Sequence, residues 1–151
     1  MFHIVDDIPE LRDILQSLMK HRGYDSMVFD STESYLAYFH SLEFAAPIAI
    51  ITDYVMTGEN GFELIKAVRE KLPMQKAVIV SATPSSELEA NIESALCYSL
   101  SKPYRAEKLY ALLAALVSCH HECGTNKDGF EAECKFGLEH ECPFFPHKLA
   151  A

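Results

Sequence analysis

The chain has 151 residues, of which 49% are hydrophobic and 23% charged, and this suits one domain of ordinary size with its own core. Thirteen basic residues against 22 acidic ones give a net charge of −9, which disfavours non-specific binding to nucleic acid because an acidic surface repels phosphate. No stretch approaches the roughly 18–20 consecutive apolar residues of a membrane-spanning helix, and the N-terminus lacks the pattern of a secretory signal. We therefore expect a cytoplasmic protein that binds neither nucleic acid nor membranes.

The first half of the chain alternates between strand and helix patterns. A run with β propensity at 2–5 predicts a first strand, in which His3 is expected to be structural or solvated rather than a ligand. The next segment starts with a proline, ends with a glycine and repeats apolar residues at helical spacing. A weaker strand at 27–29 precedes a second helix, for which residues 30–33 have the spacing of a capping box. The third strand, 48–51, is continuously apolar, as a strand covered on both faces must be.

The same alternation continues through the second half as far as about residue 118. The expected elements are a helix at 62–72, a continuously apolar strand at 77–80, a helix opened by Pro84, a strand at 97–101 and a helix from about Ala106 to Cys119. Five strands that alternate with five helices predict an α/β fold, in which a doubly wound parallel sheet carries helices on both faces.

Polar side chains follow four of the five expected strands, at the point where each strand ends. They are Asp6 and Asp7, Asp53, Ser81 and Lys102. One such residue alone often does no more than cap the next helix, but the carboxyl ends of parallel strands share one edge of a sheet, where ligands bind. Three carboxylates that meet there repel one another unless a cation is present, and oxygen ligands favour Mg²⁺. The lysine and the serine would then hold the oxygens of a phosphoryl group.

These residues stand in motifs that resemble the receiver domain of two-component response regulators, the CheY-like family. The matching segments occur in the family's order and are Val5–Asp7, Ile51–Met56 with Gly61 downstream, Val80–Ala82 and Ser101–Tyr104. The resemblance covers residues 1–118, which we expect to form the receiver domain, and leaves 119–151 as a separate tail. It implies a flavodoxin-like, five-stranded sheet with strand order 2-1-3-4-5 and a cis peptide between Lys102 and Pro103.

Carried over residue by residue, the resemblance implies a role for each polar side chain. Asp53 would accept a phosphoryl group from a histidine kinase or a phosphotransfer protein, and Ser81 and Lys102 would bind the phosphoryl oxygens. Mg²⁺ would be held by Asp6, Asp7, Asp53 and the backbone carbonyl of Val55. A carboxylate is a competent nucleophile for this transfer when a metal ion and an amine neutralise the transferred group. The chain would catalyse only its own phosphorylation and dephosphorylation.

Two positions depart from the family's pattern. Members usually carry an aromatic residue three positions before the lysine, which turns inward on phosphorylation, but this position is Ser99 here. The neighbouring Tyr98 is expected on the opposite face of the strand because side chains alternate, although Tyr104 lies near the switch face. Thr57 stands where the family often has proline. We therefore expect the conformational signal to a downstream protein to differ from the family's usual one.

The segment 119–151 holds four of the five cysteines and four of the seven histidines. In a reducing cytosol this favours a metal or redox site over disulfides, and the spacings Cys119 to Cys123 and Cys142 to His147 suit metal ligands. The expected ligand sets are Cys119, Cys123, Cys134 and Cys142, or three of these cysteines with His147. Zinc is the first candidate and an iron–sulfur cluster the second. Alternatively, the aromatic residues of the tail pack on the domain without a metal.

We favour a stand-alone receiver domain that signals to a protein partner, with a homodimer as one candidate assembly. It would have no DNA-binding output domain, because 119–151 is too short and lacks a helix-turn-helix pattern. The alternative is a metal or redox sensor that uses the receiver fold as a scaffold. A phosphatase with paired aspartates is disfavoured, because Asp6 and Asp7 are adjacent and Asp53 stands alone.

Overall fold

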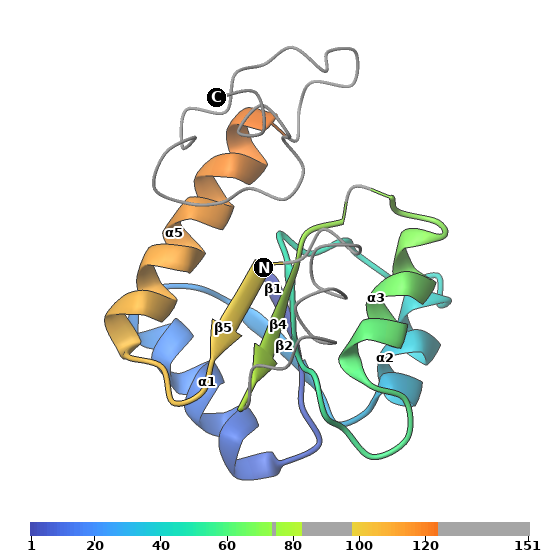
Figure 1. Cartoon of the computed structure of the whole chain (residues 1–151). Coiled ribbons are helices and arrows are strands. Elements are labelled where there is room, and N and C mark those ends of the chain that lie inside the picture. Colours follow the sequence, from blue (N-terminus) through green and yellow to red (C-terminus); the bar gives the residue numbers. More distant parts are fainter. Residues whose placement is uncertain (74, 83–97, 124–151) are drawn as a thin grey trace, which may run out of the picture.

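The computed structural model describes residues 1–73, 75–82 and 98–123 (Figure 1). Its elements are β1 (Phe2–Val5), α1 (Pro9–His21), β2 (Ser26–Phe29), α2 (Thr32–Phe39), β3 (Ile50–Asp53), α3 (Gly61–Arg69), β4 (Ala77–Ser81), β5 (Tyr98–Ser101) and α5 (Ala106–Cys123). The helix expected after Pro84 lies outside the described residues, as does the tail from residue 124. Within the described ranges no helix is long and apolar enough to cross a membrane.

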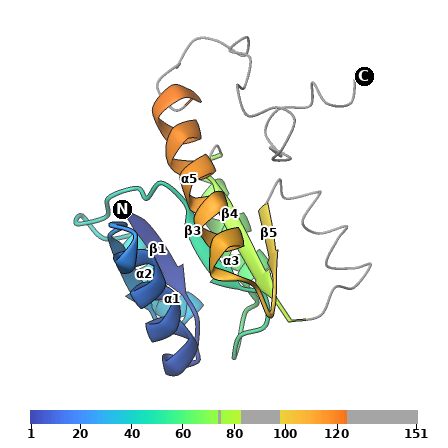
Figure 2. The same ribbon diagram turned by 90° about the vertical axis from the view of Figure 1, so that its left-hand side faces the viewer.

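The five strands form one parallel sheet in the order β2-β1-β3-β4-β5, which confirms the predicted fold. Parallel neighbours need a crossover between them, and a right-handed crossover places each helix on a face of the sheet. Helices α1 and α5 cover one face and α2 and α3 the other, as the two views in Figures 1 and 2 show. The strands all point toward one edge of the sheet, and this edge carries the polar residues discussed below.

Two apolar clusters hold these layers together. One lies between the sheet and α1 and α5, and includes Ile4, Val80 and Leu113. The other lies between the sheet and α2 and α3, and includes Val5, Ile65 and Ile79. Strands β1, β3 and β4 are buried along their whole length, which explains why the runs 50–51 and 77–80 are apolar rather than alternating.

Strand β5 differs from the other strands because its side chains alternate in exposure. Tyr98 and Leu100 pack in the cluster beneath α1 and α5, whereas Ser99 and Ser101 are exposed. Tyr98 therefore lies on the face opposite Ser99, as strand periodicity predicts.

The N-terminus of α2 begins one residue later than the capping-box spacing predicts. The N-cap is Ser31, whose hydroxyl accepts from the Ser34 backbone N–H at 3.0 Å, while the Ser34 hydroxyl accepts from the Ser31 N–H at 3.3 Å. A serine hydroxyl thus does what a glutamate carboxylate does in the usual box. The last helix also differs from expectation, because α5 continues to Cys123 rather than ending at Cys119.

Candidate functional site

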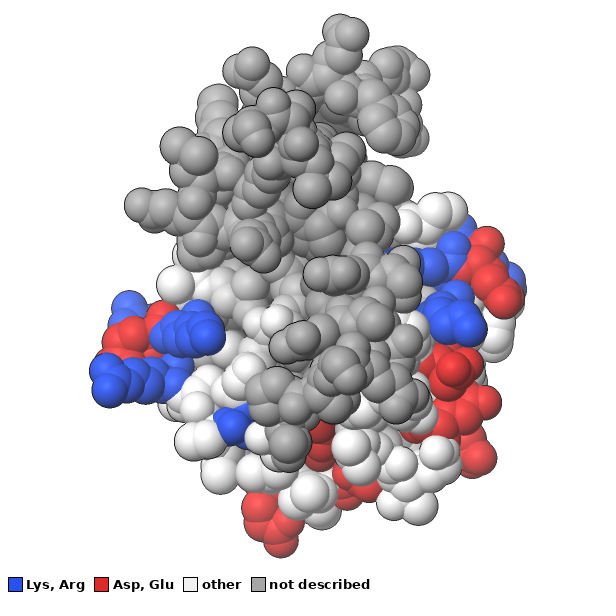
Figure 3. Space-filling view, viewed as in Figure 1, with Lys and Arg blue, Asp and Glu red and all other residues white. Residues whose placement is uncertain are grey.

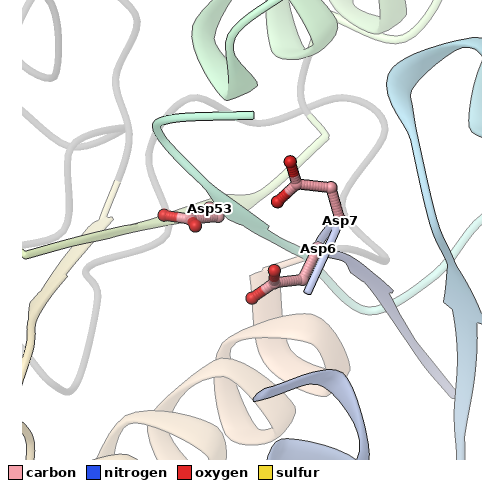
Figure 4. A group of neighbouring side chains, drawn as sticks. All are labelled: Asp6, Asp7 and Asp53. Carbon is pink, nitrogen blue, oxygen red and sulfur yellow. The ribbon is translucent and has the colours of Figure 1, made fainter. Parts of the chain in front are cut away.

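The carboxyl ends of four neighbouring strands bring the predicted polar residues to one edge of the sheet. Asp6 and Asp7 follow β1, Asp53 ends β3, and Ser81 ends β4 opposite Ser101, the residue before Lys102. Figure 4 shows the three aspartates near one another at the carboxyl ends of the neighbouring strands β1 and β3. In the orientation of Figure 1 this edge faces downward, and Figure 3 shows acidic side chains along it.

The three aspartates form a cluster of oxygen donors. One carboxylate oxygen from each of Asp6, Asp7 and Asp53 lies within 4.8 Å of the others. Asp6 and Asp53 are buried, whereas Asp7 is half-buried. Hard divalent cations prefer oxygen ligands, and Mg²⁺ keeps several waters while it binds a few carboxylates. The residues present therefore fit a magnesium ion.

The pKa of Asp6 is consistent with a cation site among the three carboxylates. Burial raises the pKa of the Asp6 carboxyl, and the nearby negative charges of Asp53 and Asp7 add to the rise. The Ile8 backbone N–H opposes the rise by donating to Asp6 Oδ1 at 2.9 Å. A cation bound between the carboxylates would remove the repulsion and favour their ionised forms.

Asp7 has a different environment, because the loop after β3 reaches back to it. The backbone N–H and the hydroxyl of Thr57 each donate to Asp7 Oδ2 at 3.0 Å. The Thr57 N–H is the main reason that the pKa of Asp7 lies below its usual value. In the sequence, Thr57 stands out only as a departure from the family's pattern, because nothing local indicates a contact with a residue 50 positions earlier.

Lys102 lies beside the central aspartate. Its Nζ is 3.3 Å from Asp53 Oδ2, and its backbone N–H donates to the Ser81 carbonyl at 2.7 Å. The peptide between Lys102 and Pro103 is cis, as the resemblance implied. Ser81 itself is buried. The lysine is thus held between the end of β4 and the Asp53 carboxylate, where it can neutralise added negative charge.

The loop after β3 carries Val55, whose backbone carbonyl was expected among the metal ligands. Val55 lies two residues after Asp53, and its side chain is exposed. The Val55 side chain therefore does not pack in the core, and the Val55 backbone carbonyl remains a proposed ligand of Mg²⁺.

A cavity of about 530 Å³ adjoins Asp53 and Lys102 on the side of α1. Its apolar lining from α1 consists of Leu11, Ile14, Leu15 and Leu18. Tyr104 also lines the cavity; burial raises the pKa of its hydroxyl, and the charge of Asp6 adds to the rise. The helical spacing of the apolar residues in α1 predicts an amphipathic helix and gives no sign of this cavity.

Gly61 explains how the loop after β3 returns so closely to the strand. Its N–H donates to the Tyr54 carbonyl at 3.0 Å. A Cβ at this position would collide with the backbone carbonyl oxygen of Asp53 and come within 2.9 Å of Thr52 Oγ1. Only a residue without a side chain allows α3 to begin against the end of β3.

Replacing Gly61 with alanine should therefore destabilise the protein by about 1–3 kcal/mol, the usual cost of overpacking. Urea denaturation followed by circular dichroism measures this loss. Gly58→Ala is the comparison, because a Cβ there meets no atom within 4 Å and adds only the strain of a φ of +91°. A Gly61→Ala variant as stable as the unsubstituted protein would contradict the close approach.

The cysteines and the histidine of the predicted tail site are divided between described and undescribed parts of the chain. Cys119 and Cys123 lie four residues apart within α5. Cys134, Cys142 and His147 lie outside the described residues. The zinc or iron–sulfur site therefore stays a prediction.

Comparison with known proteins identifies the family. The response regulator receiver domain matches residues 2–114. The chain is 27% identical over 134 residues to a probable disease resistance protein of Arabidopsis thaliana (At5g66900), covering 86% of this chain and 15% of that protein. It is also 27% identical over 123 residues to the DNA-binding transcriptional regulator NtrC of Salmonella typhimurium, covering 79% of this chain and 25% of NtrC. The chain thus spans a quarter or less of the length of these two relatives.

A solved structure shows the same similarity in three dimensions. A response regulator receiver protein from Pseudomonas putida superimposes with a TM-score of 0.68 at 27% identity, covering 75% of this chain and 93% of that one. The sheet order, the cluster of aspartates and the match over residues 2–114 agree with one another. The chain therefore belongs to the response regulator receiver domain family.

Proposed function

We propose that this chain accepts a phosphoryl group on Asp53 in a reaction that requires Mg²⁺. Receiver domains of this family are phosphoacceptor signalling modules that bind Mg²⁺ at a cluster of aspartates. The observation that carries the proposal is the position of Asp53 between Lys102 and two further carboxylates. Its Oδ2 is 3.3 Å from the lysine Nζ, and one carboxylate oxygen from each of the three aspartates lies within 4.8 Å of the other two.

The chemistry is an in-line phosphoryl transfer. An Asp53 oxygen attacks phosphorus, the new O–P bond forms as the N–P bond to a donor histidine breaks, and the histidine nitrogen keeps the electron pair and takes up a proton. Lys102 and Ser81 would contact the oxygens of the transferred group, where negative charge gathers. Mg²⁺, when held by Asp6, Asp7, Asp53 and the Val55 carbonyl, would neutralise further charge on the same group. Water would later hydrolyse the acyl phosphate.

A histidine kinase or a phosphotransfer protein is the proposed donor. Receiver domains interact with such donors and with downstream targets. The surface beside Asp53 supports docking of a protein, because Ile8 and Ile14 of the α1 region are 43% and 55% exposed. Exposed apolar side chains at the rim of a reactive site favour an apolar partner surface.

The proposal includes a cytoplasmic location and an output through a protein partner or a second copy of the chain. Phosphorylation adds a charge of about −1.5 to −2, and the added oxygens next to Ser81 and Lys102 would rearrange the chain at the carboxyl ends of β4 and β5. Because Ser99 has replaced an aromatic residue, this rearrangement would not bury a ring at that position.

The direct test is incubation of the purified chain with a small phosphoryl donor such as acetyl phosphate, with and without Mg²⁺. Intact-protein mass spectrometry should show the addition of one phosphoryl group when Mg²⁺ is present. A chelator should stop the reaction, because the carboxylates then repel the incoming phosphate. Labelling that continues after chelation would contradict the metal requirement, and a folded chain that is never labelled would contradict the proposal as a whole.

The second candidate is a metal or redox sensor built on the receiver scaffold. It is favoured by the continuation of α5 to Cys123, which places Cys119 and Cys123 at i and i+4 of one helix. Elemental analysis and a visible absorption spectrum of freshly purified protein distinguish the two candidates. Stoichiometric zinc or iron would support a sensor role, whereas its absence would leave phosphorylation as the function.

A further inference from the structure

We propose that Thr57 is a positioning residue for the metal site, which fixes the Asp7 carboxylate and so strengthens the binding of a divalent cation. The inference rests on the proposed function, because it takes Asp6, Asp7 and Asp53 as the ligands of Mg²⁺. It concerns a residue at which this chain departs from the family's frequent proline.

The contact between Thr57 and Asp7 joins two loops at the edge of the sheet. The Thr57 N–H and hydroxyl both donate to Asp7 Oδ2, each at 3.0 Å. A carboxylate offers roughly four acceptor sites on its two oxygens. Two hydrogen bonds on one oxygen therefore leave acceptor sites free for coordination to a cation.

Asp7 needs such a partner more than the other two aspartates do. Asp6 and Asp53 are buried, and each also has a donor within reach, the Ile8 N–H at 2.9 Å and Lys102 Nζ at 3.3 Å. Asp7 is half-buried, so packing alone does not determine its rotamer. Repulsion from the other two carboxylates favours turning it out toward water. The two donors of Thr57 hold it in place before the cation arrives.

Restraining the Asp7 carboxylate before the cation binds should increase the affinity of the site for the cation. A free aspartate side chain loses rotamer entropy when it binds a metal ion, and a restrained one has already lost it. Hydrogen bonds to ligating carboxylates act in this way at many metal sites, and their removal typically lowers metal affinity by about 10–100-fold. Because Thr57 is exposed, the loss of its hydroxyl alone should lower the affinity by an amount near the lower end of that range.

The two hydrogen bonds to Asp7 require both a backbone N–H and a side-chain hydroxyl at position 57. Serine retains both donors, valine retains the N–H and the branched shape but lacks the hydroxyl, and proline lacks both the N–H and the hydroxyl. The three substitutions therefore remove none, one or two of the hydrogen bonds at a single exposed position.

The test is a Mg²⁺ titration of the full chain and of these variants, followed by amide chemical shifts in the loop after β3. We expect Thr57→Ser to bind Mg²⁺ as the unsubstituted chain does. Thr57→Val should bind about tenfold more weakly, and Thr57→Pro more weakly still, toward the upper end of the 10–100-fold range. Without Mg²⁺, the ¹³C signal of the Asp7 carboxylate should move in Thr57→Val and stay in place in Thr57→Ser, with the signals of Asp6 and Asp53 little changed.

Glu59→Gln provides the matched control, since it alters an exposed residue of the same loop and should leave the affinity unchanged. Equal or tighter Mg²⁺ binding by Thr57→Val would overturn the inference, because the hydroxyl would then be neutral or would compete with the cation. If the unsubstituted chain binds Mg²⁺ and is phosphorylated while Thr57→Val binds equally well, only this inference fails. If the unsubstituted chain does not bind Mg²⁺, the proposed function fails with it.

Discussion

Replacing Asp53 with asparagine should abolish phosphorylation of the chain, with no phosphoryl adduct detectable by intact-protein mass spectrometry. The amide has nearly the size of the carboxylate, so the buried end of β3 should stay folded. It has no negative charge and is not a nucleophile for phosphorus, and it loses the ion pair with Lys102 Nζ. Of the clustered aspartates, Asp53 is the one that pairs directly with this lysine in the part of the chain that the structure describes.

The control for this result is Glu59→Gln, which removes the same charge from an exposed residue in the loop that follows β3. This variant should be labelled as fully as the unsubstituted chain. An adduct that persists in Asp53→Asn would place the acceptor at another residue, and peptide mapping would then identify it. Loss of labelling in both variants would show that net charge, rather than the nucleophile, controls the reaction.

The free energy of unfolding should fall by about 3 kcal/mol between pH 7 and pH 4 because of one buried histidine. His3 lies in β1 with no exposed surface, and its Nδ1 is 2.9 Å from the Tyr35 hydroxyl. Its Nε2 has no hydrogen-bond partner among the described residues. The rings around it belong to Phe29, Tyr35, Tyr38 and Phe44. A protonated ring would place an unpaired charge in this aromatic cluster.

The direction of the effect follows from the two pKa values. Burial lowers the pKa of His3 from 6.5 to about 4 in the folded chain. Between these values the unfolded chain binds a proton that the folded chain does not, so the stability is fully present above pH 6.5 and is lost as the pH falls toward 4. A difference of this size corresponds to about 3 kcal/mol at 1.36 kcal/mol per pKa unit.

Urea denaturation at several pH values measures the loss, and variants isolate the contribution of His3. His3→Phe keeps an aromatic ring in the cluster and should remove this part of the pH dependence, while acidic groups elsewhere contribute equally to both proteins. His21→Gln alters an exposed histidine at the end of α1 and should leave the dependence intact. An identical pH dependence in His3→Phe would contradict the assignment to His3.

Much of this protein is determined by local sequence patterns. The runs 50–51 and 77–80 are apolar because strands in the middle of a parallel sheet are covered on both faces. The parallel direction of all strands then requires that Asp6, Asp53 and Lys102 meet at one edge, whatever the details of the loops. For this reason the fold and the group of polar residues could be predicted without coordinates.

Contacts between distant loops were decided only by the tertiary structure. The two hydrogen bonds from Thr57 to Asp7 span 50 residues, and the aromatic surroundings of His3 come from β2, α2 and the loop that follows α2. The steric requirement at Gly61 likewise depends on how closely α3 approaches β3. Periodicity reports which face of an element is buried, but it does not report which atoms meet across two loops. These contacts depend on side-chain geometry and packing, which only the folded chain determines.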